Sequence, residues 1–237
     1  MLRQIASFIA APENHFLSQT LAYLALCLVP IVASILISIP LGILVAQNPT
    51  LAFAAANISG LARAIPTLAF LAIMLPVLGI GFVPSVVALT LLGIPPILLN
   101  TIAGLRGIDP AATEAGRGMG MTREQLLWRV RIPLVLPVVA AGVRTAAVQI
   151  VATAPLAALI GGGGYGDYIL QGLDLAQTVP LIVGAGGVAI LALIVEFALA
   201  GVQRAVTPVG IRERGQAAAP VEQGGASAAG EEEALAA

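Results

Sequence analysis

The side chains that could carry out covalent or metal chemistry are few in this chain. Its 237 residues include one histidine, His15, one cysteine, Cys27, and no lysine. Without lysine the chain lacks the GxxxxGK[ST] loop that holds nucleotide phosphates. One histidine and one cysteine supply no His/Cys metal cluster and no plausible Cys-His or Ser-His catalytic pair. We therefore expect that the chain is not an enzyme, holds no metal and no cofactor, and leaves any use of ATP to a partner.

Charged residues gather in one stretch, residues 113–133, with the sequence TEAGRGMGMTREQLLWRVRIP. It holds four of the eleven arginines and two of the twelve acidic residues. Just before it, Asp109-Pro110 predicts a helix start, because the carboxylate can cap free amides and proline presets φ at the first helical position. On this helix Ala111, Ala115 and Gly118 share a face of nearly bare backbone, which another protein can approach closely.

A second short helix is predicted after a sharp corner. Gly118 and Gly120 end the first helix, and Thr122 with Gln125 forms a capping box that starts the next helix, which ends before Pro133. A charged connection between membrane spans can also be a solvated loop that follows the positive-inside rule. Composition alone favours this simpler interpretation.

The composition places these elements in a membrane. Of all residues, 59% are hydrophobic and 10% are charged, and the mean hydropathy of +1.00 is far from that of a soluble domain. The net charge of −1 argues against a nucleic-acid partner. Since a spanning helix needs about 20 mostly apolar residues, we expect an all-α membrane protein with helices over 21–46, 58–79, 82–105, 134–160 and 179–202.

The positions of the arginines predict the orientation. The connection 106–132 carries five arginines and the segment after the fifth span carries three, whereas the connections 80–81 and 161–178 carry none. By the positive-inside rule the arginine-rich segments are cytoplasmic. The N-terminus is then outside and the C-terminus inside.

Three parts are expected along the chain. An apolar run near the N-terminus is too short to span a bilayer, and the C-terminal segment is rich in small and acidic residues without a periodic apolar face. We expect an interfacial or loosely ordered lead-in over 1–17, a transmembrane domain over 18–205, and a disordered cytoplasmic tail over 206–237.

The charged stretch resembles a known signature. Glu114-Ala115-Gly116, then Gly120, then Val130-Arg131-Ile132-Pro133 are similar to EAA-x3-G-x9-I-x-L-P, found in membrane subunits of binding-protein-dependent ATP-binding-cassette importers. The three departures, at Gly116, Val130 and Ile132, are small or aliphatic substitutions.

The resemblance implies a type I importer permease with coupling helices at about 110–131. In that family the segment sits in a cleft of the ATPase subunit. The residues implied to couple to the ATPase are Glu114, Ala115, Gly116, Gly118, Gly120, Met121 and Thr122.

Five segments narrow the resemblance to the osmoprotectant branch, which imports glycine betaine, carnitine and choline. They are residues 39–47, 65–81, 114–122, 136–146 and 161–169, and the similarity covers about residues 18–205. It implies a bacterial cytoplasmic membrane in contact with lipid, a second permease copy or paralogue, two ATPase subunits and an extracytoplasmic substrate-binding protein. Quaternary amines are recognised by aromatic cages, and the ten aromatic residues here are scattered along the chain, so we expect the cage on the binding protein.

Two further groups of residues have a functional and a simpler interpretation. Arg63, Pro66, Asn100 and Arg144 are candidates for the gate or path, yet arginines can reach the interface and prolines can merely kink helices. The loop residues Gly163, Gly164, Tyr165, Gly166 and Asp167 follow a glycine-rich turn and either face the binding protein or form a plain re-entrant turn.

Other transport classes stay open. A permease for another small solute, such as an amino acid, shares the signature. A secondary transporter would need intramembrane acids, and only Glu196 qualifies, with a buried partner or snorkelling to the interface as its simpler role. A channel or a structural membrane protein would not need the helix corner.

Overall fold

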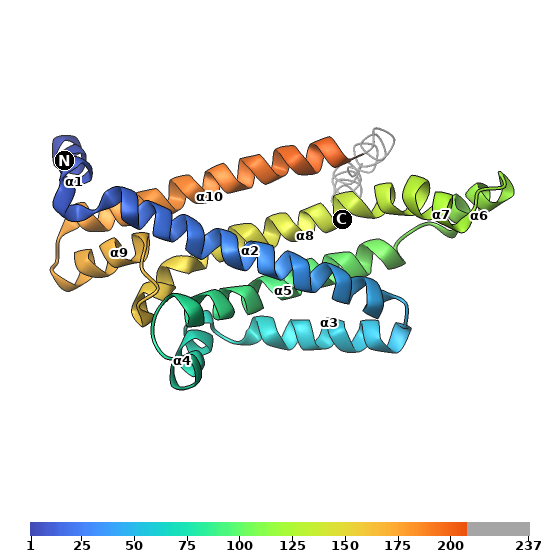
Figure 1. Ribbon diagram of the computed structural model, residues 1–237, viewed down its shortest axis with the longest axis horizontal. Helices are drawn as coiled ribbons and strands as arrows, with labels where there is room; N and C mark the ends of the chain where they lie inside the picture. Colours follow the sequence, from blue (N-terminus) through green and yellow to red (C-terminus); the bar gives the residue numbers. More distant parts are fainter. Residues whose placement is uncertain (208–237) are drawn as a thin grey trace, which may run out of the picture. The chain divides into compact units, whose positions relative to one another are not determined.

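The computed structural model describes residues 1–207, and all of its regular structure is helical (Figure 1). This confirms the all-α class. Of the expected tail, only residues 206 and 207 are among those described. The helices and helical turns are, in order, α1 (Leu2–Ala10), η1 (Pro12–Asn14), α2 (Phe16–Ala46), α3 (Pro49–Ala64), α4 (Thr67–Leu78), α5 (Phe82–Arg106), α6 (Pro110–Gly118), α7 (Arg123–Leu126), η2 (Leu127–Arg131), α8 (Ile132–Thr153), η3 (Ala154–Ile160), α9 (Tyr165–Asp174) and α10 (Thr178–Val206).

Four helical stretches among the described residues are long and apolar enough to cross a membrane: Pro12–Ala46, Phe82–Arg106, Arg123–Ile160 and Thr178–Val206. The remaining expected span, 58–79, is not one helix. Here α3 and α4 form a pair bent by 92°.

The bend follows from Pro66, which lacks an amide hydrogen and disfavours the helical conformation of the residue before it. Ile65 is accordingly extended, with φ −73° and ψ 124°. The prediction of one continuous helix is therefore wrong, and the pair makes a fifth span only if both halves are counted together. By contrast, Pro76, Pro95 and Pro96 lie inside α4 and α5.

The helix after the corner also differs from its prediction. α7 passes through η2, a π-helical turn, directly into α8, and Pro133 lies in the first turn of α8. Proline is tolerated there, so the predicted end before Pro133 is wrong. At its C-terminal end α8 changes at Ala154 into the seven-residue 3-10 segment η3, so the predicted span 134–160 is not α-helical throughout.

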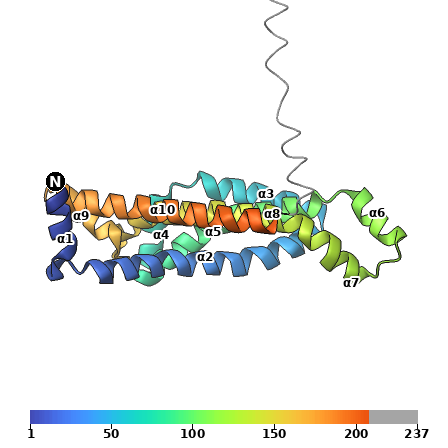
Figure 2. The same ribbon diagram turned by 90° about the horizontal axis from the view of Figure 1, so that it is seen from above.

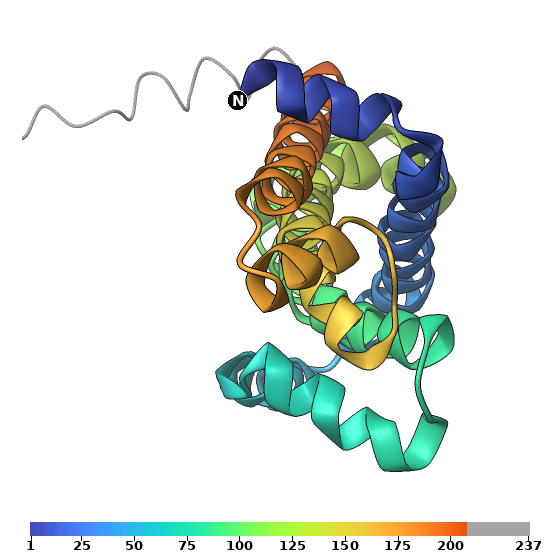
Figure 3. The same cartoon turned by 90° about the vertical axis from the view of Figure 1, so that its left-hand side faces the viewer.

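Small residues let the spanning helices approach closely. A Cβ atom added at Gly93 of α5 would lie 2.5 Å from Ser34 Oγ of α2, and one at Gly142 of α8 would lie 2.9 Å from the carbonyl oxygen of Pro96. Such contacts are typical of membrane helix pairs. In the end-on view of Figure 3, α3 and α4 lie on one side of α5, and α1 and α10 lie on the other.

The lead-in is a helix, so the loosely ordered alternative is wrong. Ile5 and Phe8 of α1 pack on the main buried cluster, which is built from α2, α5, α8, η3, α9 and α10. Leu2 and Ile9 are exposed on α1. An interfacial position of this helix stays a prediction.

Candidate functional site

The predicted helix corner is present and projects beyond the ends of the spanning helices (Figure 2). Its first helix, α6, is capped as expected, because the Ala111 N–H donates to Asp109 Oδ1 at 2.9 Å. The second, α7, has the full capping box: the Thr122 N–H donates to Gln125 Oε1 at 3.0 Å, and the Gln125 N–H donates to Thr122 Oγ1 at 3.3 Å. These caps confirm both predicted helix starts.

The corner itself is made at Gly120, whose φ of 77° lies in the left-handed region that favours glycine. No heavy atom of the described residues lies within 4 Å of a Cβ built at Gly118 or Gly120. Glu114, Ala115 and Thr122 are exposed as well, and Met121 is half-buried. The two glycines therefore leave open space on the outer side of the corner.

Gly116 has a different environment from the other predicted coupling residues. It is buried, and a Cβ there would lie 2.6 Å from Leu126 Cδ1 of α7. The glycine that replaces alanine in the signature therefore lets the two short helices pack together. It supports the corner from inside and does not add to its outer surface.

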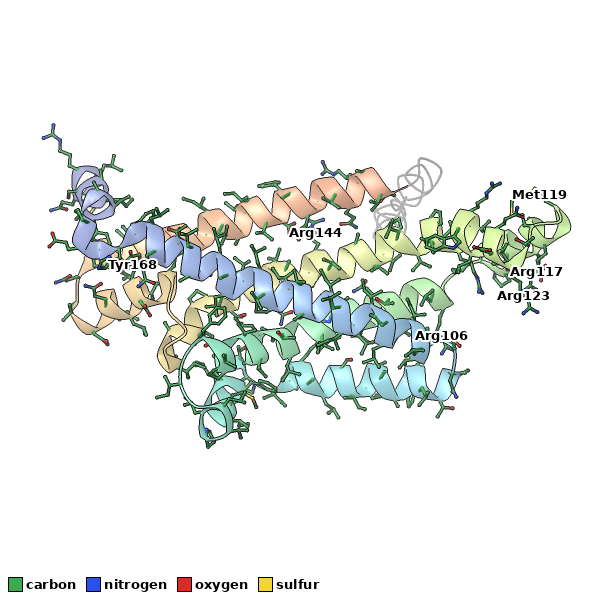
Figure 4. All side chains as sticks on the ribbon, in the orientation of Figure 1. Arg106, Arg117, Met119, Arg123, Arg144 and Tyr168 are labelled. Atoms are coloured by element: carbon green, nitrogen blue, oxygen red, sulfur yellow. The ribbon has the colours of Figure 1, made fainter. Side chains whose placement is uncertain are left out.

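Sequence reasoning missed Met119, which lies at the tip of the corner near Arg117 and Arg123 (Figure 4). Its side chain is 70% exposed. A large apolar side chain between Gly118 and Gly120 has no neighbour in sequence to cover it, and this is the signal that could have identified it.

At the other end of the molecule the glycine-rich turn is tied to the start of α2. Gln19 bridges it: the Gly164 N–H donates to Gln19 Oε1 at 2.8 Å, and Gln19 Nε2 donates to Asp167 Oδ2 at 3.1 Å. A Cβ at Gly164 would lie 2.9 Å from Tyr23. Gln19, which the sequence did not indicate, therefore fixes the geometry of this loop, which is called the outer loop because the sequence predicts that it lies outside.

Much of the predicted binding-protein loop is buried. Gly164, Tyr165 and Gly166 have little exposure, while Gly163 and Asp167 are half-buried. Any surface that this loop presents to a partner is therefore limited to Gly163 and Asp167 among the five predicted residues.

Five of the ten aromatic side chains gather behind this loop, so the description of the aromatics as scattered holds for the sequence and is wrong for the structure. They are Phe8, Phe16, Tyr23, Tyr165 and Tyr168, in contact through ring pairs. The cluster is a packed core and not a cage, since its tyrosines are buried and their hydroxyls are hydrogen-bonded.

Two of these hydroxyls join segments distant in the chain. Tyr23 donates to the Val151 carbonyl of α8 at 2.6 Å, and Tyr168 donates to the Asn14 carbonyl at 2.6 Å. Burial raises the pKa of the Tyr168 phenol. The phenol therefore remains a donor over a wider pH range than a free tyrosine.

The four gate or path candidates are not brought together. Arg63 and Pro66 lie at the α3–α4 bend. Asn100 lies between α5 and α8, where its side-chain amide donates to the Pro96 carbonyl at 2.8 Å and packs on Gly142. Arg144 pairs with Glu196 of α10, and both side chains are about one-third exposed, so Glu196 has a partner that is only partly buried. A role of these residues in the path stays a prediction.

Comparison with known proteins supports the resemblance that was inferred from the signature at the helix corner. Residues 38–208 match the family described as "Binding-protein-dependent transport system inner membrane component". The chain is 41% identical to the carnitine transport permease protein OpuCB of Listeria monocytogenes over 209 residues, which cover 88% of this chain and 96% of that protein. It is 38% identical to the glycine betaine/carnitine/choline transport system permease protein OpuCB of Bacillus subtilis, with 89% and 97% covered.

Solved structures share the fold. One is the inward-facing MetNI methionine ABC transporter, with a TM-score of 0.71, 24% identity, and coverage of 81% of this chain and 96% of that one. Another is an amino acid ABC transporter, with a TM-score of 0.65, 19% identity, and coverage of 80% and 92%. With relatives aligned over most of their length and a type I importer fold, the chain belongs to the family of binding-protein-dependent transport system inner membrane components, the multi-pass permeases of ATP-binding-cassette importers.

Proposed function

We propose that this chain is the membrane-spanning subunit of an ATP-driven importer of small quaternary-amine osmoprotectants. The observation that carries the importer part is the projecting α6–α7 corner, with its open glycines at Gly118 and Gly120. The open space at these two glycines, on either side of the exposed Met119, suits a close contact with another protein. Because the chain has no lysine and therefore no P-loop, the partner at this corner is the subunit that binds and hydrolyses ATP.

The substrate class is supported by the relatives. Those named above carry carnitine, glycine betaine or choline in their names, and an osmoprotectant import permease protein of Salmonella typhimurium, OsmW, is 36% identical with 84% of this chain covered. These solutes share a quaternary ammonium group. The family consists of transport components, which are not enzymes, so this chain selects and conducts the solute and does not change it.

Two copies of the chain, or one copy and a paralogue, form the path between them in this proposal. An extracytoplasmic binding protein delivers the solute at the end that carries α9 and the outer loop. Closure of the ATPase pair pushes the α6–α7 corners and moves the spans as rigid bodies between inward-facing and outward-facing states.

The orientation follows from the arginines. Arg106, Arg117, Arg123, Arg129 and Arg131 lie on α5, the corner and η2, at the end of the molecule opposite to the outer loop. By the positive-inside rule this end is cytoplasmic. The proposal therefore places the N-terminus outside and the C-terminus inside.

The test is a substrate panel against ATP hydrolysis by the reconstituted complex, with and without the binding protein. Stimulation by glycine betaine, carnitine or choline only when the binding protein is present supports the proposal. Stimulation by an amino acid or a sugar, and by none of the three amines, overturns the substrate class and leaves the importer class standing.

A further inference from the structure

A cavity of about 440 Å³ lies between the α3–α4 bend, the C-terminal end of α2 and the middle of α5. Its walls are mostly aliphatic. On α5 the lining runs from Ala88 to Leu98, which is the central part of the helix Phe82–Arg106. The cavity therefore lies beside the central part of α5, and its volume is within the range of small-ligand sites.

Three polar side chains line this cavity: Ser59 and Arg63 of α3, and Thr67 at the start of α4. None of them has a hydrogen bond or an ion pair within residues 1–207. Arg63 is the only charged residue of the lining. Arg63 is exposed, and an unpaired guanidinium in a spanning segment is costly unless it meets water or an anion.

Ser59 gives an independent indication of a ligand. The residue is only 4% exposed, and its hydroxyl, which has no partner among the described residues, is not itself fully buried. The other buried serines behave differently: Ser34, Ser38 and Ser85 donate to backbone carbonyls. Because buried polar groups are nearly always hydrogen-bonded, a serine that opens onto a cavity without a partner indicates a group that binds there.

The helix break adds positive potential at the same place. α4 begins at Thr67 with Pro66 as its N-cap, and no side chain caps it. The first amide groups of a helix lack partners within the helix and carry the positive end of its dipole. Together with Arg63 they favour an anionic group beside Thr67. Broken helices at mid-membrane offer their ends to substrates in the same way in other transporters.

We propose that this cavity is a substrate site within the permease that binds the carboxylate of a zwitterionic quaternary amine, with Arg63 as its ion-pair partner and Ser59 as a hydrogen-bond donor. The proposal rests on the proposed function and makes the substrate class narrower. The methylated ammonium lies against the aliphatic walls and the ring of Phe70, the only aromatic residue of the lining. Glycine betaine and carnitine, which carry a carboxylate, bind here, and choline, which has none, is repelled by Arg63.

The experiment measures protection of a cysteine by ligands. Ser59→Cys and, separately, Ala62→Cys, which also lines the cavity, are made in a Cys27→Ser background. The complete complex with its ATPase is reconstituted in lipid and treated with a small thiol reagent. Glycine betaine, carnitine, choline and methionine are compared as protectants. Arg63→Gln is then added to each cysteine variant, with Arg3→Gln, an exposed arginine on α1, as the matched control.

Slower labelling with glycine betaine and carnitine, and unchanged labelling with choline, supports the site. Arg63→Gln should raise the protecting concentration about tenfold, the usual loss for a charge-assisted hydrogen bond, and Arg3→Gln should not. Protection by methionine alone keeps the carboxylate site and overturns the quaternary-amine proposal. Equal protection by choline and glycine betaine, or no protection at either cysteine, overturns the site.

Discussion

Arg144 of α8 and Glu196 of α10 form an ion pair, and Arg144 also donates to Gln203 of α10 at 3.2 Å. Both charged residues lie in apolar spanning helices, where a lone charge is costly. The pair joins two helices that are separated along the chain by η3 and α9. The charges therefore fix the register of α8 against α10.

Removing one partner should destabilise the permease more than removing both. Glu196→Gln or Arg144→Met leaves one charge uncompensated in the membrane, whereas Arg144→Met/Glu196→Met leaves none. We expect both single variants to melt several degrees below the wild type and the double variant to recover part of that loss. Thermal unfolding in detergent micelles measures this, and equal melting of all four proteins would show that the pair does not hold the helices.

Filling the outer side of the corner should uncouple transport from ATP. Gly118→Trp adds a large side chain where the described structure has open space, whereas Gly120→Trp would also force a positive φ on a non-glycine residue. We expect Gly118→Trp to reach normal membrane abundance with uptake reduced about tenfold or more, the effect of losing roughly 1.4 kcal/mol of contact energy. Gly118→Ala is the matched control, and normal uptake by the tryptophan variant contradicts the contact.

The orientation is tested by labelling with an impermeant thiol reagent in a Cys27→Ser background. Asp174→Cys, at the end of α9, should react in intact cells, and Glu124→Cys in α7 should react only after permeabilisation. Both positions are exposed, and neither has a positive φ, unlike Gly163. The opposite labelling pattern would falsify the proposed topology.

Gln19 should position the outer loop for the binding protein. Gln19→Leu removes the acceptor of the Gly164 N–H and the donor to Asp167. We expect the binding-protein concentration for half-maximal stimulation of ATP hydrolysis to rise about fivefold, equivalent to one hydrogen bond, with basal hydrolysis unchanged. Ser18→Ala, an exposed neighbour, controls for general effects. Unaltered stimulation in Gln19→Leu would show that the loop does not meet that partner.

Tyr168 should make stability depend on alkaline pH. Its folded-state pKa is raised by burial, so the neutral phenol is favoured by folding. Its contribution is fully present below the unfolded tyrosine pKa of about 10 and is lost as pH rises through the higher folded pKa. Tyr168→Phe lacks this titration, so its melting temperature should fall less steeply with pH in this range. Parallel pH dependence of the two proteins would contradict the prediction.

The sequence is a reliable guide to the corner because its signals are local. The Asp109 cap and the Thr122–Gln125 capping box act over two or three residues, and the side-chain types alone determine them. Hydrophobic length likewise identifies the long spans. These features do not depend on how the chain folds back on itself.

The features that were missed depend on tertiary contacts. Pro30 and Pro40 lie inside α2 without ending it, whereas Pro66 interrupts the helix between α3 and α4. The local sequence does not distinguish the prolines that a helix tolerates from the proline that ends one. The difference depends on whether neighbouring helices cover the backbone carbonyl that loses its hydrogen bond at the proline. The contact of Tyr23 with Tyr165 and the pairing of Arg144 with Glu196 join distant segments with no periodic signal between them.

The two ends of the corner are attached to the spanning region with different stiffness. α6 follows α5 after a non-helical connection at Gly107–Asp109, whereas α7, η2 and α8 continue from Arg123 to Thr153 without a break. At 1.5 Å per residue this continuous stretch is about 45 Å long. Only the α6 side of the corner has a non-helical connection, so the stretch from Arg123 to Thr153 can tilt as one piece. A tilt of about 5° about its corner end would move its far end by about 4 Å. That far end holds Val151, the acceptor of the Tyr23 hydroxyl, so a tilt of this stretch about the corner would move the α8 carbonyl to which the aromatic cluster is hydrogen-bonded.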